Sequence, residues 1–286
     1  MPTRPVAVPG PAHPPARPNG AGPRRSNSYV EAFARGLSVV RAFGRGDDSG
    51  LTLARIAERT GLTRANVRRV LLTLMELGYV EQEEKVFRLR PGILDLGYAY
   101  LSSTPLTRVA QPVMEDVVAQ LQLPCNLSVL DRDDAIVIGR VAVRRISDLA
   151  LALNIGRRFP AYLTAMGRLL LAGLPEPELA AYLARASLKR LTARTVTDPA
   201  QLRRVVQADL ARGWSLVEGE QSELVCSMAV PVTDGRRQVV ATLSVGWPSG
   251  DLTPAEMEER VLPVLRSAGA EVSRFIAMGS HGIPRS

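Results

Sequence analysis

The sequence predicts an α+β fold in which a small winged helix-turn-helix precedes a larger domain built on an antiparallel sheet flanked by helices. Three patterns lead to this prediction. Residues 51–80 contain two short amphipathic helix patterns around a glycine turn, residues 92–101 form an apolar helix pattern, and short strand patterns recur from residue 125 onwards. At 286 residues the chain is long enough for roughly two domains.

Composition sets the boundaries of these parts. Residues 1–27 contain eight prolines and hardly any large apolar side chain, so we expect a disordered tail that cannot bury enough surface to fold. The predicted parts are the tail (1–27), the winged helix-turn-helix (28–91), a linker helix (92–104), the larger domain (105–279) and a short terminal tail (280–286).

The first domain is predicted from helical spacing. A first helix spans residues 29–43, with apolar residues at Tyr29, Val30, Phe33, Leu37, Val40 and Phe43. The next carries Leu53, Ile56 and Ala57 on one stripe, and Gly61 ends it. Thr63 then caps the following helix by accepting the backbone N–H of Ala65 or Asn66. The inward stripe of that helix is Val67, Val70, Leu71, Leu74 and Leu77.

The opposite face of this second helix is positive and has the residue types that read DNA. Arg64, Arg68 and Arg69 occur with no acid between residues 63 and 73, whereas a helix face that is merely solvated usually mixes both signs. Arginine bonds guanine in the major groove, which admits such a helix. The predicted DNA-binding residues on this helix are Thr63, Arg64, Ala65, Asn66, Arg68 and Arg69.

A hairpin and the charge distribution support the same interpretation. Residues 81–89 read as two short strands around a charged turn, a wing in which Lys85 and nearby arginines are expected to bind phosphates. Residues 1–92 carry 15 basic and eight acidic side chains, whereas residues 93–286 are almost balanced, with 21 and 20. A polyanionic partner is therefore expected at the N-terminal third.

The linker helix is too apolar to be exposed on all sides, so we expect it to be buried against a second copy of the chain. A dimer also suits DNA binding, because two helices read two half-sites. No run of eighteen apolar residues and no apolar leader occurs, which indicates a protein without a membrane span or signal peptide, expected in the cytoplasm.

The larger domain mixes helix and strand patterns. Residues 109–121 form an amphipathic helix, residues 125–130 and 135–141 a hairpin, and residues 149–153 a further strand. A loop over 160–174 leads into a helix, and helices are predicted over 177–185, 199–212 and 254–278. Strands are predicted over 214–218, 225–232 and 239–245.

The residues for most enzyme chemistry are missing from this domain. The only histidines are His13 and His281, both in the predicted tails, so no serine or cysteine nucleophile gains a histidine base. Asp131, Asp133 and Asp134 lack the glycine and glutamate of a calcium loop. Neither GxxxxGK[ST] nor GxGxxG occurs. We therefore expect no catalytic residues, no metal and no cofactor.

Three stretches together resemble the IclR family of bacterial transcriptional regulators over nearly all of residues 29–278. They are RGLSVVRAFG with LTLARIAERTGLTRANVRRVLLTLMELGYV, then LRPGILDLGYAYLSS, and finally GRRFPAYLTAMGRLLLAGLP with VCSMAVPVTDGRRQVVATLSVGWP. The first two are most similar to the branch that contains PcaR, PcaU and PobR, regulators of protocatechuate, 4-hydroxybenzoate and β-ketoadipate metabolism.

The resemblance implies a winged helix-turn-helix dimer, often a dimer of dimers on promoter DNA, whose linker helix leads to a GAF-like effector-binding domain. It implies a pocket for a small organic acid, lined by positions that correspond to Asn126, Tyr162, Ala165, Met166, Glu218, Cys226 and Ser244. Met166 and Cys226 lie in apolar runs, and such residues more commonly belong to the plain core. The family's polar residue is replaced by Gly246, which suggests a larger or more apolar pocket.

An acid in a partly buried pocket needs a compensating donor. Arg140 is the leading candidate, and Arg157, Arg158 and Arg168 compete with it. Two other functions remain open. A metabolite-binding protein or enzyme with a vestigial DNA-binding head would turn over or bind a ligand without regulating DNA, and a structural DNA-bridging protein would ignore both sequence and small molecules.

Overall fold

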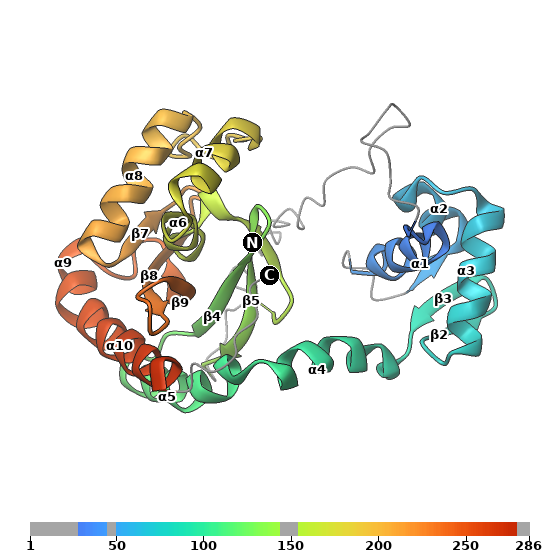
Figure 1. Ribbon diagram of the computed structural model, residues 1–286, viewed down its shortest axis with the longest axis horizontal. Helices are drawn as coiled ribbons and strands as arrows, with labels where there is room; N and C mark the ends of the chain where they lie inside the picture. Colours follow the sequence, from blue (N-terminus) through green and yellow to red (C-terminus); the bar gives the residue numbers. More distant parts are fainter. Residues whose placement is uncertain (1–27, 45–49, 144–153, 279–286) are drawn as a thin grey trace, which may run out of the picture. The chain divides into compact units, whose positions relative to one another are not determined.

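The computed structural model describes residues 28–44, 50–143 and 154–278, and the chain divides into two compact units between Tyr100 and Leu101 (Figure 1). The predicted tails at 1–27 and 280–286 and the strand predicted at 149–153 lie outside the described residues. Across the described ranges, none of the helices has the length and apolar character needed to cross a membrane.

The N-terminal unit is a winged helix-turn-helix. Its helices are α1 (Glu31–Ala42), α2 (Leu53–Thr60) and α3 (Arg64–Glu76). The wing is formed by β2 (Val80–Glu83) and β3 (Val86–Leu89), and the short β1 (Leu51–Thr52), which we did not predict, pairs with the other edge of β3 to give an antiparallel sheet in the order β1-β3-β2.

Local side-chain chemistry sets the two helix starts and the turn between them. The hydroxyl of Thr52 caps α2 by accepting the N–H of Arg55 at 3.4 Å, and that of Thr63 caps α3 by accepting the N–H of Asn66 at 3.3 Å. Gly61 ends α2 with φ of 68°, a left-handed conformation that glycine adopts at little cost. The predicted cap at Thr63 is therefore present, with Asn66 as its donor.

The observed burial in this unit differs from the prediction at one end of α1 and one end of α3. Ile56, Val67 and Leu71 are buried as predicted, but Leu77, the residue that follows the last turn of α3, is 62% exposed. At the other end, Tyr29, Val30 and Phe33 are also exposed, since α1 packs on the other helices only through its C-terminal half, where Val39 and Ala42 are buried. The remaining buried members of this core are Leu51, Leu74, Val80 and Phe87.

A linker follows the wing. A short 3-10 turn (η1, Pro91–Ile93) leads into α4 (Leu94–Ser103), and no residue of α4 is buried. Leu94, Leu96, Tyr98 and Tyr100 are all large apolar side chains that remain exposed.

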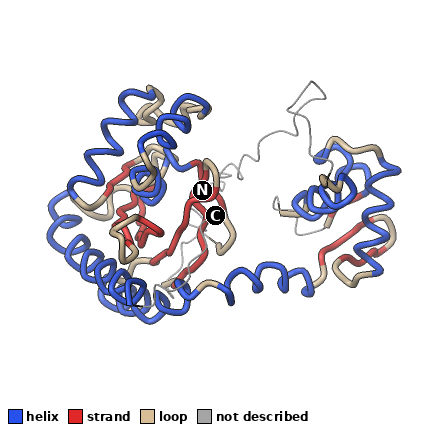
Figure 2. Tube along the Cα trace, in the orientation of Figure 1, coloured by secondary structure: helices blue, strands red, loops and turns tan. Residues whose placement is uncertain are grey.

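The C-terminal unit is a six-stranded sheet covered by helices on both faces (Figure 2). All its strand pairs are antiparallel, in the order β6-β5-β4-β9-β8-β7. The strands are β4 (Cys125–Asp131), β5 (Asp134–Val141), β6 (Arg158–Pro160), β7 (Ser215–Glu218), β8 (Val225–Thr233) and β9 (Val239–Pro248). The helices are α5 (Pro105–Leu121), α6 (Ala165–Ala172), α7 (Glu176–Arg185), α8 (Pro199–Arg212) and α10 (Leu262–Met278), and the turn η2 (Ala161–Leu163) precedes α6.

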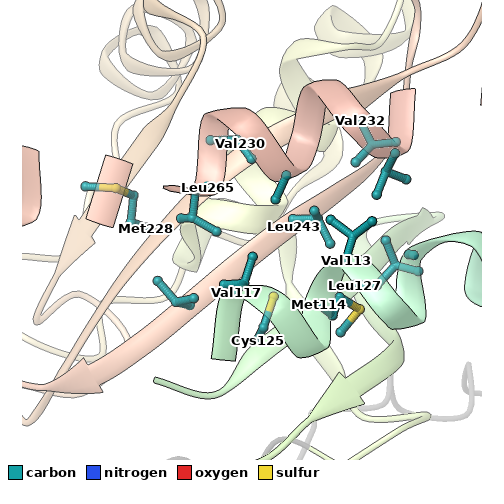
Figure 3. Close-up of a cluster of buried hydrophobic side chains, with 14 of the residues drawn as sticks. Val113, Met114, Val117, Cys125, Leu127, Met228, Val230, Val232, Leu243 and Leu265 are labelled. Carbon is teal, nitrogen blue, oxygen red and sulfur yellow. The ribbon is translucent and has the colours of Figure 1, made fainter. Parts of the chain in front are cut away.

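One face of this sheet is a continuous apolar core. Because side chains alternate along a strand, Cys125 and Leu127 of β4 and Leu243 of β9 point to the same side, where α5 and α10 cover them (Figure 3). Met114 and Val117 of α5 fill the space between. The opposite face lies under α6, whose Ala165, Leu169 and Leu170 pack on Ala135, Val137, Val217 and Ala229.

The closing helix, predicted as one helix over 254–278, is divided. A short α9 (Pro254–Glu256) is followed by a π-helical segment (η3, Met257–Val261), and only then by α10. The N–H of Leu262 bonds to the carbonyl of Met257, five residues back. Pro263 has no N–H to continue the α-helical pattern and its ring crowds the preceding turn, so the wider π turn relieves the conflict.

Neighbouring leucines on α3 test the N-terminal core. Replacing Leu71, which is buried, with alanine is expected to destabilise this unit by about 2–5 kcal/mol, because it leaves a cavity. Replacing the exposed Leu72 should change the free energy of unfolding by no more than about 0.5 kcal/mol. Urea unfolding followed by circular dichroism measures both, and equal losses would contradict the packing described here.

Candidate functional site

The first candidate site is the outer face of α3. Thr63, Arg64, Ala65, Arg68 and Arg69 are exposed, and Asn66 beside them is half-buried. The cap at Thr63 fixes the start of the helix, so these side chains leave a rigid element. They share one face because the opposite side of α3 is committed to the core.

Ion pairing separates these arginines from other basic residues of the N-terminal unit. Arg35 pairs with Glu31, Arg55 with Glu58, Arg88 with Glu83 and Arg90 with Glu81. By contrast, Arg64, Arg68 and Arg69 form no ion pair with any residue of the described ranges. Exposed pairs of this kind stabilise a protein little, but they lower the net charge that a distant anion meets. The outer face of α3 therefore carries three neighbouring cations that no carboxylate of the described residues neutralises.

The wing is closer to neutral than the sequence suggested. Lys85 is exposed at the turn between β2 and β3, as a phosphate contact requires. The nearby arginines, Arg88 and Arg90, are already paired with the glutamates of β2, and Glu84 lies next to Lys85. Of the wing cations, Lys85 is therefore the one best placed for an external phosphate.

The second candidate site is the polar row on the α6 side of the sheet, which we define as Asn126 and Ser128 of β4 with Thr242 and Ser244 of β9. Asn126 pairs with Ser244 and Ser128 with Thr242 across the two strands, so all four side chains point to the same face. All four are buried. Ser227 and Gly246, paired between β8 and β9, extend the row on that face.

Met166 of α6 covers the polar row. The hydroxyl of Ser128 donates to the Met166 sulfur at 3.0 Å, and the hydroxyl of Ser244 approaches the same sulfur at 3.9 Å. The Thr242 hydroxyl has no hydrogen-bond partner among the described residues. A thioether is a weak acceptor on a flexible side chain. A ligand oxygen would therefore be a better hydrogen-bond acceptor for the hydroxyls of the polar row than the Met166 sulfur is.

Two of the four competing arginines are already neutralised. Arg158 pairs with Asp131 and Asp134 at 2.7 and 3.0 Å, and Arg168 pairs with Glu220 at 2.7 Å. Arg140 lies across from Asn126 and donates to its side-chain oxygen at 3.3 Å. Arg157 stacks over Phe159 at 5.3 Å from the ring centroid, and burial lowers the pKa of its guanidinium. Arg140 occupies the strand position paired with Asn126, on the face of the polar row, and is therefore the arginine that the geometry favours for binding an acid.

The structure does not bring every predicted residue to the polar row. Cys226 belongs to the apolar core on the other face, and Glu218 pairs with it in register on that same face. Tyr162 is buried beside α6, but its hydroxyl is bonded to the backbone N–H and carbonyl of Lys189, at 2.8 and 2.9 Å. The predicted residues that do meet are Asn126, Arg140, Ala165, Met166 and Ser244.

The pocket residues predicted from the family resemblance do not include three members of this site, namely Ser128, Thr242 and Ser227. Each is two residues from another member on the same strand, or directly across from one, so strand alternation applied to Asn126 and Ser244 would have found them. The same alternation excludes Cys226, which is adjacent to Ser227. Burial raises the pKa of Cys226, and that of Cys125 to about 12, so both thiols stay protonated at neutral pH.

Comparison with known proteins identifies relatives of both units. Sequence profiles of the "IclR helix-turn-helix domain" and of "Bacterial transcriptional regulator IclR C-terminal" match residues 32–84 and 98–274. The Pca regulon regulatory protein of Pseudomonas putida is 42% identical over 245 residues, which cover 85% of this chain and 83% of that protein.

Two solved structures extend the comparison. A putative transcriptional regulator from Rhodococcus sp. RHA1 is 38% identical, with a TM-score of 0.78 over 88% of this chain and 100% of the other. The inducer binding domain of a double mutant of the Acinetobacter PobR transcription factor, in complex with 3-hydroxybenzoic acid, is 26% identical. Its TM-score is 0.56, and the match covers 59% of this chain and 98% of that domain.

Two buried threonines test the assignment of the polar row. Replacing Thr242 with valine removes a hydroxyl that has no partner in the described structure, so the free energy of unfolding should stay the same or rise. Thr195 is equally buried, but its hydroxyl donates to the Glu220 carbonyl and accepts two backbone N–H groups, so the same replacement there should cost about 1–3 kcal/mol. Denaturant unfolding compares them, and a larger loss at Thr242 would contradict this account.

Proposed function

The chain belongs to the IclR family of DNA-binding transcriptional regulators, and from that premise we propose that a small organic acid from aromatic-acid catabolism modulates its binding to promoter DNA. The observation that carries the proposal is the buried polar row, where the hydroxyls of Ser128 and Ser244 meet only the Met166 sulfur and the Thr242 hydroxyl has no hydrogen-bond partner among the described residues. Such a set is suited to a ligand that has a hydroxyl or keto oxygen as well as a carboxylate.

DNA recognition is assigned to the outer face of α3. The helices of two protomers enter successive major grooves, where Ala65, Asn66 and Arg69 contact base edges. Arg64 and Arg68 bond phosphates and set the register, and Lys85 of the wing adds a further phosphate contact. The unpaired charge of the three arginines supports this assignment, because no carboxylate of the described chain competes with DNA for them.

The effector class is inferred from the residues around the polar row. A carboxylate taken into a buried site needs a charged donor, and Arg140, with Arg157 as the second choice, would supply it. The ligand hydroxyl would replace the Met166 sulfur as partner of Ser128 and Ser244. The relative that controls a Pca regulon and the PobR domain solved with 3-hydroxybenzoic acid favour an acid from aromatic catabolism, such as protocatechuate, 4-hydroxybenzoate or β-ketoadipate.

Two copies are required by this mechanism. The exposed Leu94, Leu96, Tyr98 and Tyr100 of α4 make an apolar helix that a second chain would cover, giving a homodimer or a dimer of dimers. The effector would bias the relative placement of the two DNA-binding heads. A protein acting on promoter DNA in this way works in the bacterial cytoplasm.

A function without catalysis is also part of the proposal. Both histidines, His13 and His281, are outside the described residues, and the two cysteine thiols are buried and protonated. The competing function, a metabolite-binding protein or enzyme with a vestigial DNA-binding head, predicts turnover of a candidate acid or binding that leaves DNA affinity unchanged. Chromatography of each acid after incubation with the protein distinguishes the first of these outcomes.

Arginine variants of α3 test the DNA assignment. Arg69→Ala should reduce discrimination among operator sequences by about 1–3 kcal/mol, because one base contact is lost. Arg64→Ala and Arg68→Ala should weaken binding to all sequences alike, because each removes a phosphate contact. Each should also reduce the slope of log Kd against log salt concentration by about one.

Fluorescence anisotropy with an operator and a scrambled duplex, at several salt concentrations, measures these effects. The matched control is Arg55→Ala, because that side chain is exposed but paired with Glu58. Wild-type affinity in all three α3 variants would overturn the assignment.

Calorimetry of the full chain with protocatechuate, 4-hydroxybenzoate and β-ketoadipate tests the effector class. Arg140→Gln should weaken binding of the acid by about tenfold or more, since a charge-assisted hydrogen bond contributes about 1.5–3 kcal/mol. Arg236→Gln is the control, because Arg236 is exposed in the turn before β9. Absence of heat with all three acids would contradict the proposed effector class.

A further inference from the structure

Residues 186–198, which connect α7 to α8, contain no helix or strand. A segment of this length inside a compact domain needs partners for its backbone groups. Several of them are provided by two residues outside the segment. Tyr162 binds its first half through the hydroxyl bonds to Lys189, and the Glu220 region binds its second half.

The contacts at Glu220 are dense. Its carboxylate accepts the backbone N–H of Val196 at 3.1 Å, and its carbonyl accepts the hydroxyl of Thr195 at 2.8 Å. The neighbouring carbonyl of Gly219 accepts the hydroxyl of Thr192 at 2.7 Å. The loop between β7 and β8 therefore holds residues 192–196 by backbone and side-chain bonds together.

Arg168 connects Tyr162 and Glu220, the two residues that bind the segment 186–198. Its terminal nitrogen Nη2 lies 2.7 Å from each oxygen of the Glu220 carboxylate, and its Nε donates to the backbone carbonyl of Tyr162 at 3.3 Å. Arg168 is 3% exposed, and the Glu220 side chain 10%. Every other ion pair between described residues has at least one member that is more than a fifth exposed. A buried pair is costly unless its members make further hydrogen bonds, and here Arg168 also bonds the Tyr162 carbonyl and Glu220 also accepts the N–H of Val196.

Arg168 is also on the helix that covers the polar row. It lies two residues after Met166 in α6, and the carbonyl that it binds belongs to η2, the turn from which α6 begins. Close packing restricts this turn further, because an added Cβ at Gly167 would lie 2.2 Å from the carbonyl oxygen of Ala161. The start of α6 is thus held by Arg168 from one side and by the turn from the other.

We propose that Arg168 and Glu220 are positioning residues for the effector site: the pair holds the start of α6 so that Met166 lies over the polar row, without either residue touching the effector. The inference rests on the proposed function, because it concerns the same site. Loss of the pair is expected to release residues 186–198 and Met166 together, and to weaken binding of the acid as a consequence.

The test uses the full chain with Arg168→Met and Glu220→Gln combined. This double variant leaves no lone buried charge, and glutamine can still accept the N–H of Val196, so the protein should fold. We expect backbone N–H exchange at Lys189 and Val196 to become about tenfold faster or more. The ¹³C-methyl signal of Met166, assigned by its loss in Met166→Leu, should shift. Affinity for 4-hydroxybenzoate should fall about tenfold, while effector-free DNA affinity stays within about twofold.

Two variants make the result specific. Arg168→Lys keeps the charge beside Glu220 and should restore most of the exchange protection and the methyl signal. Arg203→Met with Glu176→Gln removes an exposed ion pair between α7 and α8, and it should leave every readout unchanged.

The outcomes distinguish failure of the positioning proposal from failure of the proposed effector class. Wild-type exchange and an unshifted Met166 signal in the double variant would overturn the proposal, even if acid affinity fell, because the pair would then act on the ligand directly. A wild-type protein that binds none of the three acids would contradict the proposed effector class instead. Exchange and the methyl signal would still decide whether the pair positions Met166.

Discussion

The antiparallel pairing of β4 with β9 is the constraint on which the C-terminal unit depends. It places Cys125, Leu127 and Leu243 on one face, where α5 and α10 bury them, and therefore places the polar row on the other face under α6. A shift of one residue would exchange these faces and bury hydroxyls in the apolar core. The stability of the domain and the chemistry of the candidate site thus follow from one strand register.

Burial makes the hydrogen-bond partners of the polar row important for its free energy. Hydroxyls in water lose little by changing partners, whereas buried hydroxyls are stabilised by any good acceptor that reaches them. Met166 offers only a sulfur to Ser128 and Ser244, and Thr242 has no partner among the described residues. The apolar core opposite has no comparable capacity to exchange partners, which makes the α6 face the part of the domain that a polar ligand would stabilise.

In the N-terminal unit, ion pairs neutralise some of the basic residues and leave others without a carboxylate partner. Four basic residues outside α3, two of them in the wing, are paired with glutamates, whereas the three arginines of α3 pair with no carboxylate of the described residues. Thr63 and the buried face of the helix hold these arginines on a rigid scaffold. The packing that stabilises the unit therefore also fixes the orientation of the helix that carries these arginines.

The sequence by itself determined the helix-turn-helix, the wing and most elements of the larger domain, because caps, turns and hydrophobic periodicity are local properties. It also identified the family and the arginines of α3. Tertiary structure alone decided that Leu77 and Phe33 are exposed, that Cys226 faces away from Ser244, and that Arg168 is bound to Glu220, 52 residues away in the chain. These outcomes depend on strand register and on contacts between distant segments, which no local pattern in one sequence records.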